Sequence, residues 1–353
     1  MDLADLSDLT LRDPQNMLAH IDSLPSQLQA AWELGQSLPL PECKEIRQVI
    51  ISGMGGSAIG AELLAAYAAS TCRVPIIVHR DYGLPAYAQD PETLVIVLSH
   101  SGNTEETLDS FETARINGCT LMTVSTGGQL GKISTEEGVP LWQFEHKGQP
   151  RAAVGYSFGM LLAALTRLGL ITDPENEINE AVEAMCTQQE SLRADIPVAR
   201  NPAKRLAGQL MERFVIVVAS GYLAPVARRW KTQINEIAKA AAQFEILPEA
   251  DHNTLAGLLN PQPFQTHTMT IFLRAPSDHP RNRLRLDLTR QGFMMEGMNT
   301  DFYNARGNSP LAHIWTALHF GDYNAYYLAL AYGMDPTPVT ALEDLKATLK
   351  SID

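Results

Sequence analysis

The sequence predicts an α/β protein with two doubly wound domains, each a mostly parallel sheet flanked by helices. Two observations support this fold class. From about residue 47 to 172, short apolar runs alternate with turns and helical patterns, as in parallel strands joined by helices. Around residue 213 the order of strand, Ser-Gly turn and helix begins again. The 353 residues are enough for two domains of ordinary size.

Residues 1–40 are predicted to form an N-terminal helical segment packed on the outside of the protein, ending near Pro39 and Pro41. The first domain is expected over residues 41–172. An apolar helix over 152–170 closes it. Its expected strands are Val49–Ile51, Val74–Val78, Leu94–Leu98, Leu121–Val124 and Val139–Phe144.

Residues 173–200 are polar and of mixed charge, which predicts a linker with an exposed helix. The second domain is expected over residues 201–353. Its sequence echoes the first half only weakly, because the Ser220-Gly221 turn lacks a glycine cluster. The predicted strands are 213–219, Phe244–Leu247 and Met269–Leu273, and the predicted helices include Trp230–Ala242 and Ala341–Leu349.

Composition and charge narrow the class of partner. The net charge of −13 argues against binding to nucleic acid or to anionic membrane surfaces. No apolar stretch approaches the roughly 20 residues that span a bilayer. The four cysteines lie far apart without metal-ligand spacing, as expected of thiols in a reducing compartment. The acidic start, Met1–Asp5, is unlike a signal peptide, so we expect a cytoplasmic protein.

Two loops rich in small residues follow predicted strands and precede predicted helices. They are Gly53-Met54-Gly55-Gly56-Ser57 and Ser99-His100-Ser101-Gly102-Asn103-Thr104. A glycine turn at a helix start exposes backbone N–H groups to an anion, and the helix dipole favours negative charge there. Hydroxyls of the second loop can complete a cage around one phosphate. The predicted phosphate-binding residues are Gly55, Gly56, Ser57, Ser99, Ser101 and Thr104.

Two other interpretations of these loops are open. Gly53-x-Gly55-x-x-Ala58 fits the dinucleotide fingerprint, with Asp81 as a ribose-binding acid. The Ser57 hydroxyl and the second loop argue against it, since a dinucleotide site requires neither. Helix capping by Thr104 or its neighbour is the structural alternative, but it does not account for both serines of the second loop.

The two loops resemble the sugar isomerase (SIS) domain, which binds phosphosugars. The second half adds motifs similar to the bifunctional phosphoglucose/phosphomannose isomerase family. These motifs are Asn235-Glu236-Ile237-Ala238-Lys239, Pro248-Glu249-x-x-His252-Asn253, Gly321-Asp322-Tyr323, Asp335-Pro336-Thr337-Pro338-Val339 and Leu345-Lys346. The resemblance covers about residues 45–350 and implies two SIS-type domains.

The resemblance implies a homodimeric aldose–ketose isomerase. It would interconvert glucose 6-phosphate, and mannose 6-phosphate, with fructose 6-phosphate through a cis-enediol. A proton moves rather than a hydride, so neither metal nor organic cofactor is expected. The resemblance makes Glu236 the base, and His252 of the neighbouring subunit and Lys346 the ring-opening groups. It makes Arg151 the cation that stabilises the enediolate.

The residues themselves are compatible with these roles. A carboxylate on a rigid helix suits proton transfer, although Glu236 between Lys231 and Lys239 also fits a solvated helix face. A histidine in a polar loop has an ordinary pKa near 6.5, which suits ring opening. Arg151 begins an apolar helix, where a positive charge opposes the dipole. Lys350 competes with Lys346 for the ring-opening role.

Three rival functions make different predictions. A non-catalytic phosphosugar-binding SIS regulator would bind without turnover. An amino-sugar phosphate isomerase would act on a different sugar. A nucleotide-dependent dehydrogenase would require NAD.

Overall fold

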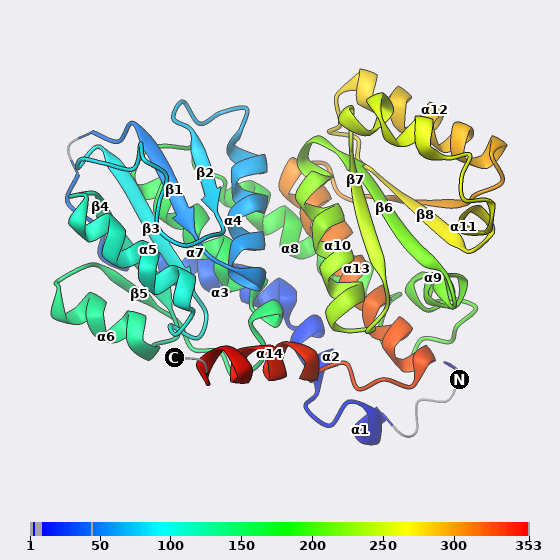
Figure 1. Ribbon diagram of the computed structural model, residues 1–353, viewed down its shortest axis with the longest axis horizontal. Helices are drawn as coiled ribbons and strands as arrows, with labels where there is room; N and C mark the ends of the chain where they lie inside the picture. Colours follow the sequence, from blue (N-terminus) through cyan, green and yellow to red (C-terminus); the bar gives the residue numbers. More distant parts are fainter. Residues whose placement is uncertain (1–2, 4–8, 44, 352–353) are drawn as a thin grey trace.

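Two parallel sheets, one from each half of the chain, lie side by side with helices on both faces of each (Figure 1). The structure is a computed structural model that describes residues 3, 9–43 and 45–351. The doubly wound α/β fold predicted from the sequence is confirmed. In the described residues no helix is long and apolar enough to cross a membrane.

The first sheet has the strand order β2-β1-β3-β4-β5, and all its pairs are parallel. Its strands are β1 (Gln48–Ser52), β2 (Ile76–His79), β3 (Thr93–Ser99), β4 (Thr120–Ser125) and β5 (Leu141–Gln143). Its helices are α4 (Gly55–Ala68), α5 (Glu105–Ile116), α6 (Gly128–Glu136) and α7 (Val154–Arg167), with the short turn η1 (Pro150–Ala152) before α7. Both faces are covered, because Ile51 packs with Phe158 of α7 while Ile50 packs with Phe111 of α5.

The second sheet repeats this plan with one strand fewer in the described residues, in the order β7-β6-β8-β9. Its strands are β6 (Phe214–Ser220), β7 (Ala242–Leu247), β8 (Thr268–Arg274) and β9 (Asn299–Asn304). Its helices and turns are α9 (Pro202–Leu210), η2 (Gly221–Leu223), α10 (Ala224–Glu236), η3 (Glu249–His252), η4 (Thr254–Gly257), α11 (Gln262–Thr266), α12 (Pro280–Met295), α13 (Pro310–Tyr332) and α14 (Thr340–Lys350). Val217 packs toward α10 and α13, and Val218 packs toward α12.

The N-terminal segment is part of the core rather than an outer layer. It forms α1 (Leu9–Arg12), α2 (Met17–Asp22) and α3 (Leu24–Gly35), and α3 packs against α7. Leu28 and Ala31 are completely buried. The helix predicted as exposed between the halves, α8 (Glu175–Gln189), is also buried along one side, through Ile178 and Met185. Its polar composition hides an apolar stripe at helical spacing that packs on α13 and α3.

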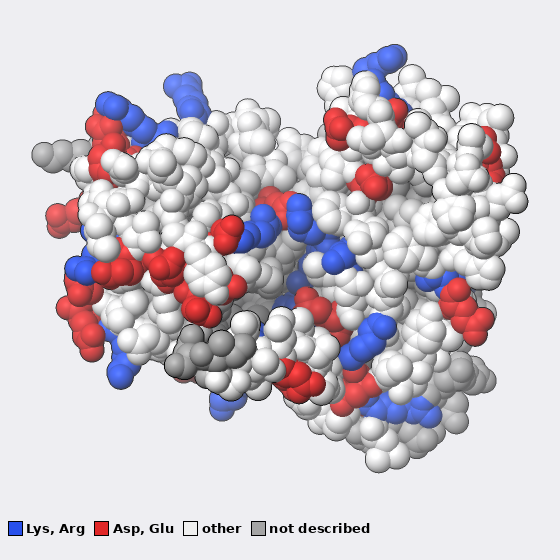
Figure 2. Space-filling model, in the orientation of Figure 1, with Lys and Arg blue, Asp and Glu red and all other residues white. Residues whose placement is uncertain are grey.

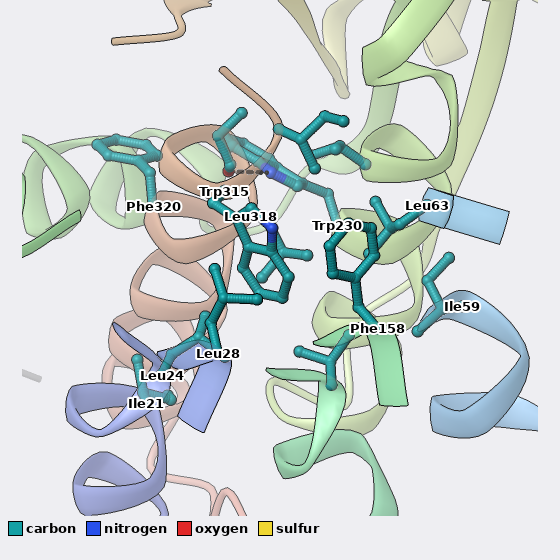
Figure 3. Close-up of a cluster of buried hydrophobic side chains, with 14 of the residues drawn as sticks. Ile21, Leu24, Leu28, Ile59, Leu63, Phe158, Trp230, Trp315, Leu318 and Phe320 are labelled. Carbon is teal, nitrogen blue, oxygen red and sulfur yellow. Dashed lines mark hydrogen bonds between the residues drawn. The ribbon is translucent and has the colours of Figure 1, made fainter. Parts of the chain in front are cut away.

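One continuous core joins the two halves. Figure 3 shows Leu28 of α3, Leu63 of α4, Trp230 of α10 and Trp315 of α13 converging in it. Gly321 makes this packing possible, because a Cβ there would lie 2.2 Å from the Trp230 Nε1 atom. Trp230 Nε1 instead donates a hydrogen bond of 2.8 Å to the Ala317 carbonyl. The halves therefore hold each other in a fixed arrangement.

Candidate active site

The two predicted phosphate loops meet at the carboxyl ends of β1 and β3, the central neighbours of the first sheet. In the order β2-β1-β3 the chain winds away in opposite directions from these two strands, which opens a crevice where α/β proteins bind ligands. The loops touch directly, because the His100 backbone N–H donates to Ser57 Oγ at 3.3 Å. The sheet topology thus brings together residues more than forty positions apart.

Both helices begin without a side-chain cap in the described chain. Met54 and Thr104 precede α4 and α5 in extended conformation, and neither accepts a capping hydrogen bond through its side chain. The first N–H groups of a helix carry partial positive charge when they lack partners. Two such helix starts at one crevice make a favourable place for an anion.

The four predicted hydroxyls occupy different positions around this crevice. Ser57 and Ser99 are buried, at 5% and 1% exposure, while Ser101 is exposed and Thr104 half-buried. Ser99 Oγ donates to Thr104 Oγ1 at 3.0 Å. Ser101 Oγ accepts from the backbone N–H of Asn103 at 3.2 Å, within its own loop. The hydroxyls of Ser57 and Thr104 are linked to the rest of the loop pair, whereas that of Ser101 serves its own turn.

Arg151 is brought against the start of α4 by the absence of a side chain at Gly56. A Cβ on Gly56 would lie 2.6 Å from the Pro150 carbonyl oxygen and 2.8 Å from the Arg151 nitrogen. The guanidinium is buried, with 4% exposure, and its Nη2 donates to the carbonyl oxygens of Pro336, at 3.1 Å, and Thr337. Its Nε is buried with no hydrogen-bond partner in the described chain. Burial lowers the pKa of Arg151.

Glu236 lies at the last residue of α10, not inside a longer helix as the sequence predicts. The alanine-rich continuation leaves the helix because Lys239 adopts a left-handed backbone, with φ of 54°, and Ala242 joins β7. A Glu236 Oε2 atom lies 3.6 Å from Nη1 of Arg151. The side chain keeps 29% of its surface exposed, so it stays accessible to a ligand.

Glu236, Arg151 and the α4 glycines line one cavity between the two halves. Figure 2 shows acidic and basic side chains gathered in the hollow between them. The lining residues are Gly55, Gly56, Ile59, Arg80, Arg151, Arg228, Arg229, Lys231, Thr232, Gln233, Glu236 and Phe244. The first half contributes the helix N-terminus, and the second half contributes the carboxylate.

A buried ion pair supports Arg151 from behind. Arg229 Nη2 donates to the Arg151 carbonyl at 2.8 Å and to Asp322 Oδ2 at 2.7 Å, while its Nε donates to Asp322 Oδ1 at 3.2 Å. The Arg229 and Asp322 side chains are at most 4% exposed. This pair places the Gly321-Asp322-Tyr323 motif directly behind the site.

Lys239 and Arg151 both hold the segment that leads to α14. Lys239 Nζ donates to the Asp335 carbonyl at 2.5 Å, next to the carbonyls that Arg151 contacts. Burial and the nearby Arg151 charge lower the pKa of Lys239 to about 8. The start of the Asp335–Val339 motif is thereby fixed against Arg151 and Lys239.

Sequence reasoning missed the cations at the mouth of the cavity. Arg80 and Arg228 both contact Glu62, at 2.5 Å and 3.0 Å, and so join the residue after β2 to α4 and α10. Lys231 lines the cavity from α10. The signal was the dense run of positive charge at 228–231 in a chain of net charge −13.

His252 and Lys346 do not line this cavity. His252 ends η3 on the surface of the second half, and Lys346 lies on α14, where every described side chain is exposed. The side chain of Lys350 lies outside what the structure describes. The choice between these lysines therefore stays a prediction.

Three histidines lie beside the phosphate loops. His100 Nε2 and His146 Nδ1 are 2.9 Å apart, and the rings of His146 and His20 lie 5.1 Å apart. Burial first, and then the neighbouring rings of His100 and His20, lower the pKa of His146 to about 4. The described residues contain no group of three or more His, Cys, Asp or Glu side chains placed to hold a metal ion.

The corresponding point of the second sheet is filled from within. Ser220, at the end of β6, donates its hydroxyl to Asp278 Oδ1 at 3.1 Å, and the Ala275 N–H donates to Asp278 Oδ2 at 2.7 Å. Asp278 is 4% exposed. Its carboxylate thus occupies the donors at the switch point between β6 and β8.

The chain is similar to known proteins over most of its length. Residues 199–349 match the family model described as the bacterial phospho-glucose isomerase C-terminal SIS domain. A bifunctional phosphoglucose/phosphomannose isomerase from Caldicellulosiruptor bescii is 38% identical over 95% of this chain and 99% of its own length. One from Aquifex aeolicus is 32% identical over 86% of this chain and 90% of its own.

Among solved structures, a glucose-6-phosphate isomerase like protein from Thermus thermophilus superposes with a TM-score of 0.63. It is 21% identical, and the match covers 96% of this chain and 98% of that chain. At this identity the likeness supports the fold.

Proposed function

Because the chain belongs to the bifunctional phosphoglucose/phosphomannose isomerase family, we propose that it interconverts glucose 6-phosphate and mannose 6-phosphate with fructose 6-phosphate. One observation carries the mechanism. The Arg151–Glu236 pair and the uncapped start of α4 face a single cavity. A phosphate anion and a reacting carbon of the same small sugar can therefore be held at once.

The phosphate end belongs to the first half. In this proposal the N–H groups of Gly55 and Gly56, which line the cavity, and the hydroxyls of Ser57, Ser99, Ser101 and Thr104 bind the phosphate. Their partial positive charges suit a phosphate ester without any metal. Arg80, Arg228 and Lys231 add positive charge at the mouth, which attracts an anionic sugar to an otherwise acidic protein.

Glu236 is the base that moves the proton. Its carboxylate removes the proton from C2 of the open-chain aldose, and the electron pair forms the C1–C2 double bond of a cis-enediolate. The same carboxyl then returns the proton to C1 while the O2–H proton passes to O1, so that C2 becomes the carbonyl carbon of the ketose. Arg151, whose Nη1 lies 3.6 Å from Glu236 Oε2, stabilises the negative oxygen of the enediolate.

Ring opening falls to His252 and Lys346 in this proposal, with His252 supplied by a second copy of the chain. His252 is mounted rigidly at the surface. The preceding Asp251 accepts hydrogen bonds from Arg285, at 2.7 Å, and Thr289, at 2.6 Å, both on α12. Leu284 and Leu288 of the same helix are 45% and 56% exposed. Their exposure beside a fixed histidine supports a homodimer that completes each active site.

We also infer a cytoplasmic location, supported by four cysteines that are all free thiols. The substrate is a phosphorylated hexose, and the site residues given above are to be tested directly.

Replacing Glu236 by Gln tests the mechanism. We expect kcat for conversion of fructose 6-phosphate to glucose 6-phosphate and to mannose 6-phosphate to fall about 10²- to 10⁴-fold, because the amide cannot take the proton. KM should change little, since the phosphate contacts remain. Coupled assays measure both products. Glu33→Gln, an exposed change on α3, is the control and should match the wild type.

Full activity of Glu236→Gln would contradict this role. A wild-type protein that binds fructose 6-phosphate without turnover would indicate a regulatory SIS protein. Turnover of glucosamine 6-phosphate alone would indicate the amino-sugar isomerase.

A further inference from the structure

The second sheet ends one strand earlier than the first. Its order β7-β6-β8-β9 matches β2-β1-β3-β4, and no described residue takes the place that β5 holds beside β4. β9 is therefore an edge strand. The Ala305 N–H donates to the Arg274 carbonyl of β8, so the alternation of a strand directs the backbone groups of Phe302 and Asn304 away from the sheet.

A groove runs along this edge, between β9 and α9. The residues that line it are Pro202, Arg205, Leu206, Gln209, Asp301, Phe302, Tyr303, Asn304, Ala305, Arg306 and Phe320. We call it the β9 groove. Leu206, Tyr303 and Phe320 are buried and apolar, and they form its floor. It lies apart from the Glu236 cavity, with which it shares no lining residue.

Two arginines stand at the mouth of the β9 groove. Arg205 and Arg306 are exposed, and their guanidinium groups make no hydrogen bond or ion pair within the described chain. Asp301 is the acid of the lining, and its Oδ1 accepts from the Phe302 N–H at 2.8 Å. The groove therefore offers an apolar floor, two arginines without a partner in the described chain, and the outward backbone groups of β9 other than the Phe302 N–H, which Asp301 already holds.

In the first half, the place that corresponds to the β9 groove is filled by a side chain of the fifth strand, β5. Trp142 of β5 is completely buried, and its Nε1 donates to the Pro39 carbonyl at 2.6 Å just after α3. The guanidinium of Arg167 lies 5.8 Å from the centre of the Trp142 ring. α3 precedes β1 as α9 precedes β6, so the β9 groove corresponds to the space that Trp142 occupies.

We propose that the β9 groove binds an extended segment of another protein, which adds to the second sheet as its fifth strand. Backbone hydrogen bonds to the edge of β9 supply affinity, and the pocket supplies specificity. The segment carries an aromatic side chain for the floor of Leu206 and Phe320. It carries an acidic residue for Arg205 and Arg306. A small anion would leave the strand edge and the apolar floor unused.

The chain itself supplies the probe. A fluorescein-labelled peptide with the sequence of residues 139–145, Val-Pro-Leu-Trp-Gln-Phe-Glu, has the required aromatic and acidic side chains. Fluorescence anisotropy of this peptide with the full-length protein should show saturable binding at one peptide per chain. Affinity should fall at least about tenfold with Arg306→Glu, and equally when the peptide tryptophan is replaced by alanine.

Two controls keep the test specific. Arg73→Glu makes the same charge change on an exposed residue of the first half and should leave binding unchanged. Unchanged isomerase activity of Arg306→Glu shows that this variant is folded. Hydrogen exchange should slow at the Asn304 amide in the complex, because that group gains a strand partner.

Three results would overturn the proposal. They are no binding up to about 1 mM peptide, binding that ignores both Arg306→Glu and the tryptophan change, and a change in oligomeric state caused by Arg306→Glu alone. The last result would assign the groove to a contact with a second copy of this chain.

Discussion

The Arg151 side chain both contacts backbone carbonyls and faces Glu236. Its Nη2 is engaged by the Pro336 and Thr337 carbonyls, its Nη1 faces Glu236, and its Nε–H has no partner in the described chain. A buried N–H without a partner is costly, so such a group favours an anionic ligand atom. The arginine is thus held by the protein through Nη2, while its side chain lines the cavity beside Glu236.

His146 makes the stability of the protein depend on pH. Its pKa is lowered to about 4 in the folded state, against about 6.5 when exposed. The unfolded chain therefore binds a proton first as pH falls from 6.5 to 4, and the free energy of unfolding drops over that window. The facing groups are His100 and His20, and Asp13 acts on His20. We expect a loss of about 1–2 kcal/mol, less than full burial would give, because the ring is only partly buried.

Urea unfolding at pH 7 and pH 5 measures this effect in the wild type and in His146→Asn. The asparagine variant should lose less stability between these pH values, while His267→Asn, an exposed change, should behave as the wild type. Equal losses in all three proteins would show that His146 does not carry the effect.

At this scale the sequence suggested roles for single residues but not which side chains lie together. Glu236 and Arg151 were identified through motif resemblance, and they lie 3.6 Å apart across 85 positions. The bridge of Glu62 to Arg80 and Arg228 was not predicted, because it joins three elements that no local pattern relates. Residue type indicates what a side chain can do, whereas tertiary packing determines its partners.

At the level of elements, the backbone at the start of α4 lies in close contact with the backbone of η1. Gly56→Ala would place a Cβ 2.6 Å from the Pro150 carbonyl, an atom that cannot rotate away. We expect a loss of about 1–3 kcal/mol in stability and a fall in kcat/KM, because η1 must shift and take Arg151 with it.

Thermal unfolding and the coupled assay check this prediction. Gly131→Ala in α6 is the matched control, since its Cβ would lie 3.8 Å from the Leu141 side chain of β5, an ordinary contact, and alanine favours a helix. It should be neutral or stabilising. Equal behaviour of the two variants would show that the close approach at Gly56 has no consequence.

The strands that form short apolar runs between turns were predicted within a few residues. β1, β3 and β4 match the expected apolar runs closely. β9 was missed because Asn299–Asn304 is a polar edge strand without a hydrophobic run. α10 ends six residues early, where the positive φ of Lys239 overrides the helix propensity of the nearby alanines. The local composition does not predict the ends of helices and strands that tertiary contacts determine.

At the scale of the whole molecule, a shared active site predicts complementation between two inactive variants. If His252 acts across the dimer, mixing Glu236→Gln with His252→Asn gives mixed dimers in which one of two sites is intact. Random exchange of equal amounts makes half of the dimers mixed, so activity should return to about a quarter of the wild-type value.

The coupled assay follows this recovery after refolding the two variants together. A mixture of Glu236→Gln with itself, treated in the same way, is the control. No recovery in the mixed sample would place His252 in the site of its own chain or outside the reaction.

The arrangement of the two halves lay beyond sequence reasoning. Two domains were expected, and two sheets are present, but a continuous core through Trp230 and Trp315 joins them. Burial of the N-terminal helices adds to it. Nothing in the periodicity of one element shows which other element covers it, so a linker and an outer layer were expected where the structure has core. The domain boundaries stay a prediction.

Asp278 makes the two halves differ in how many anions they can bind. In the first half, uncapped helix starts at the switch point leave room for an external anion. In the second half, Ser220 and the Ala275 N–H are already bound to the Asp278 carboxylate, which repels any further negative charge. Although the chain repeats one pattern, only the switch point of its first half is thus open to an anion. We expect the protein to bind one phosphosugar per chain, with the second half supplying the Glu236 carboxylate to the same cavity.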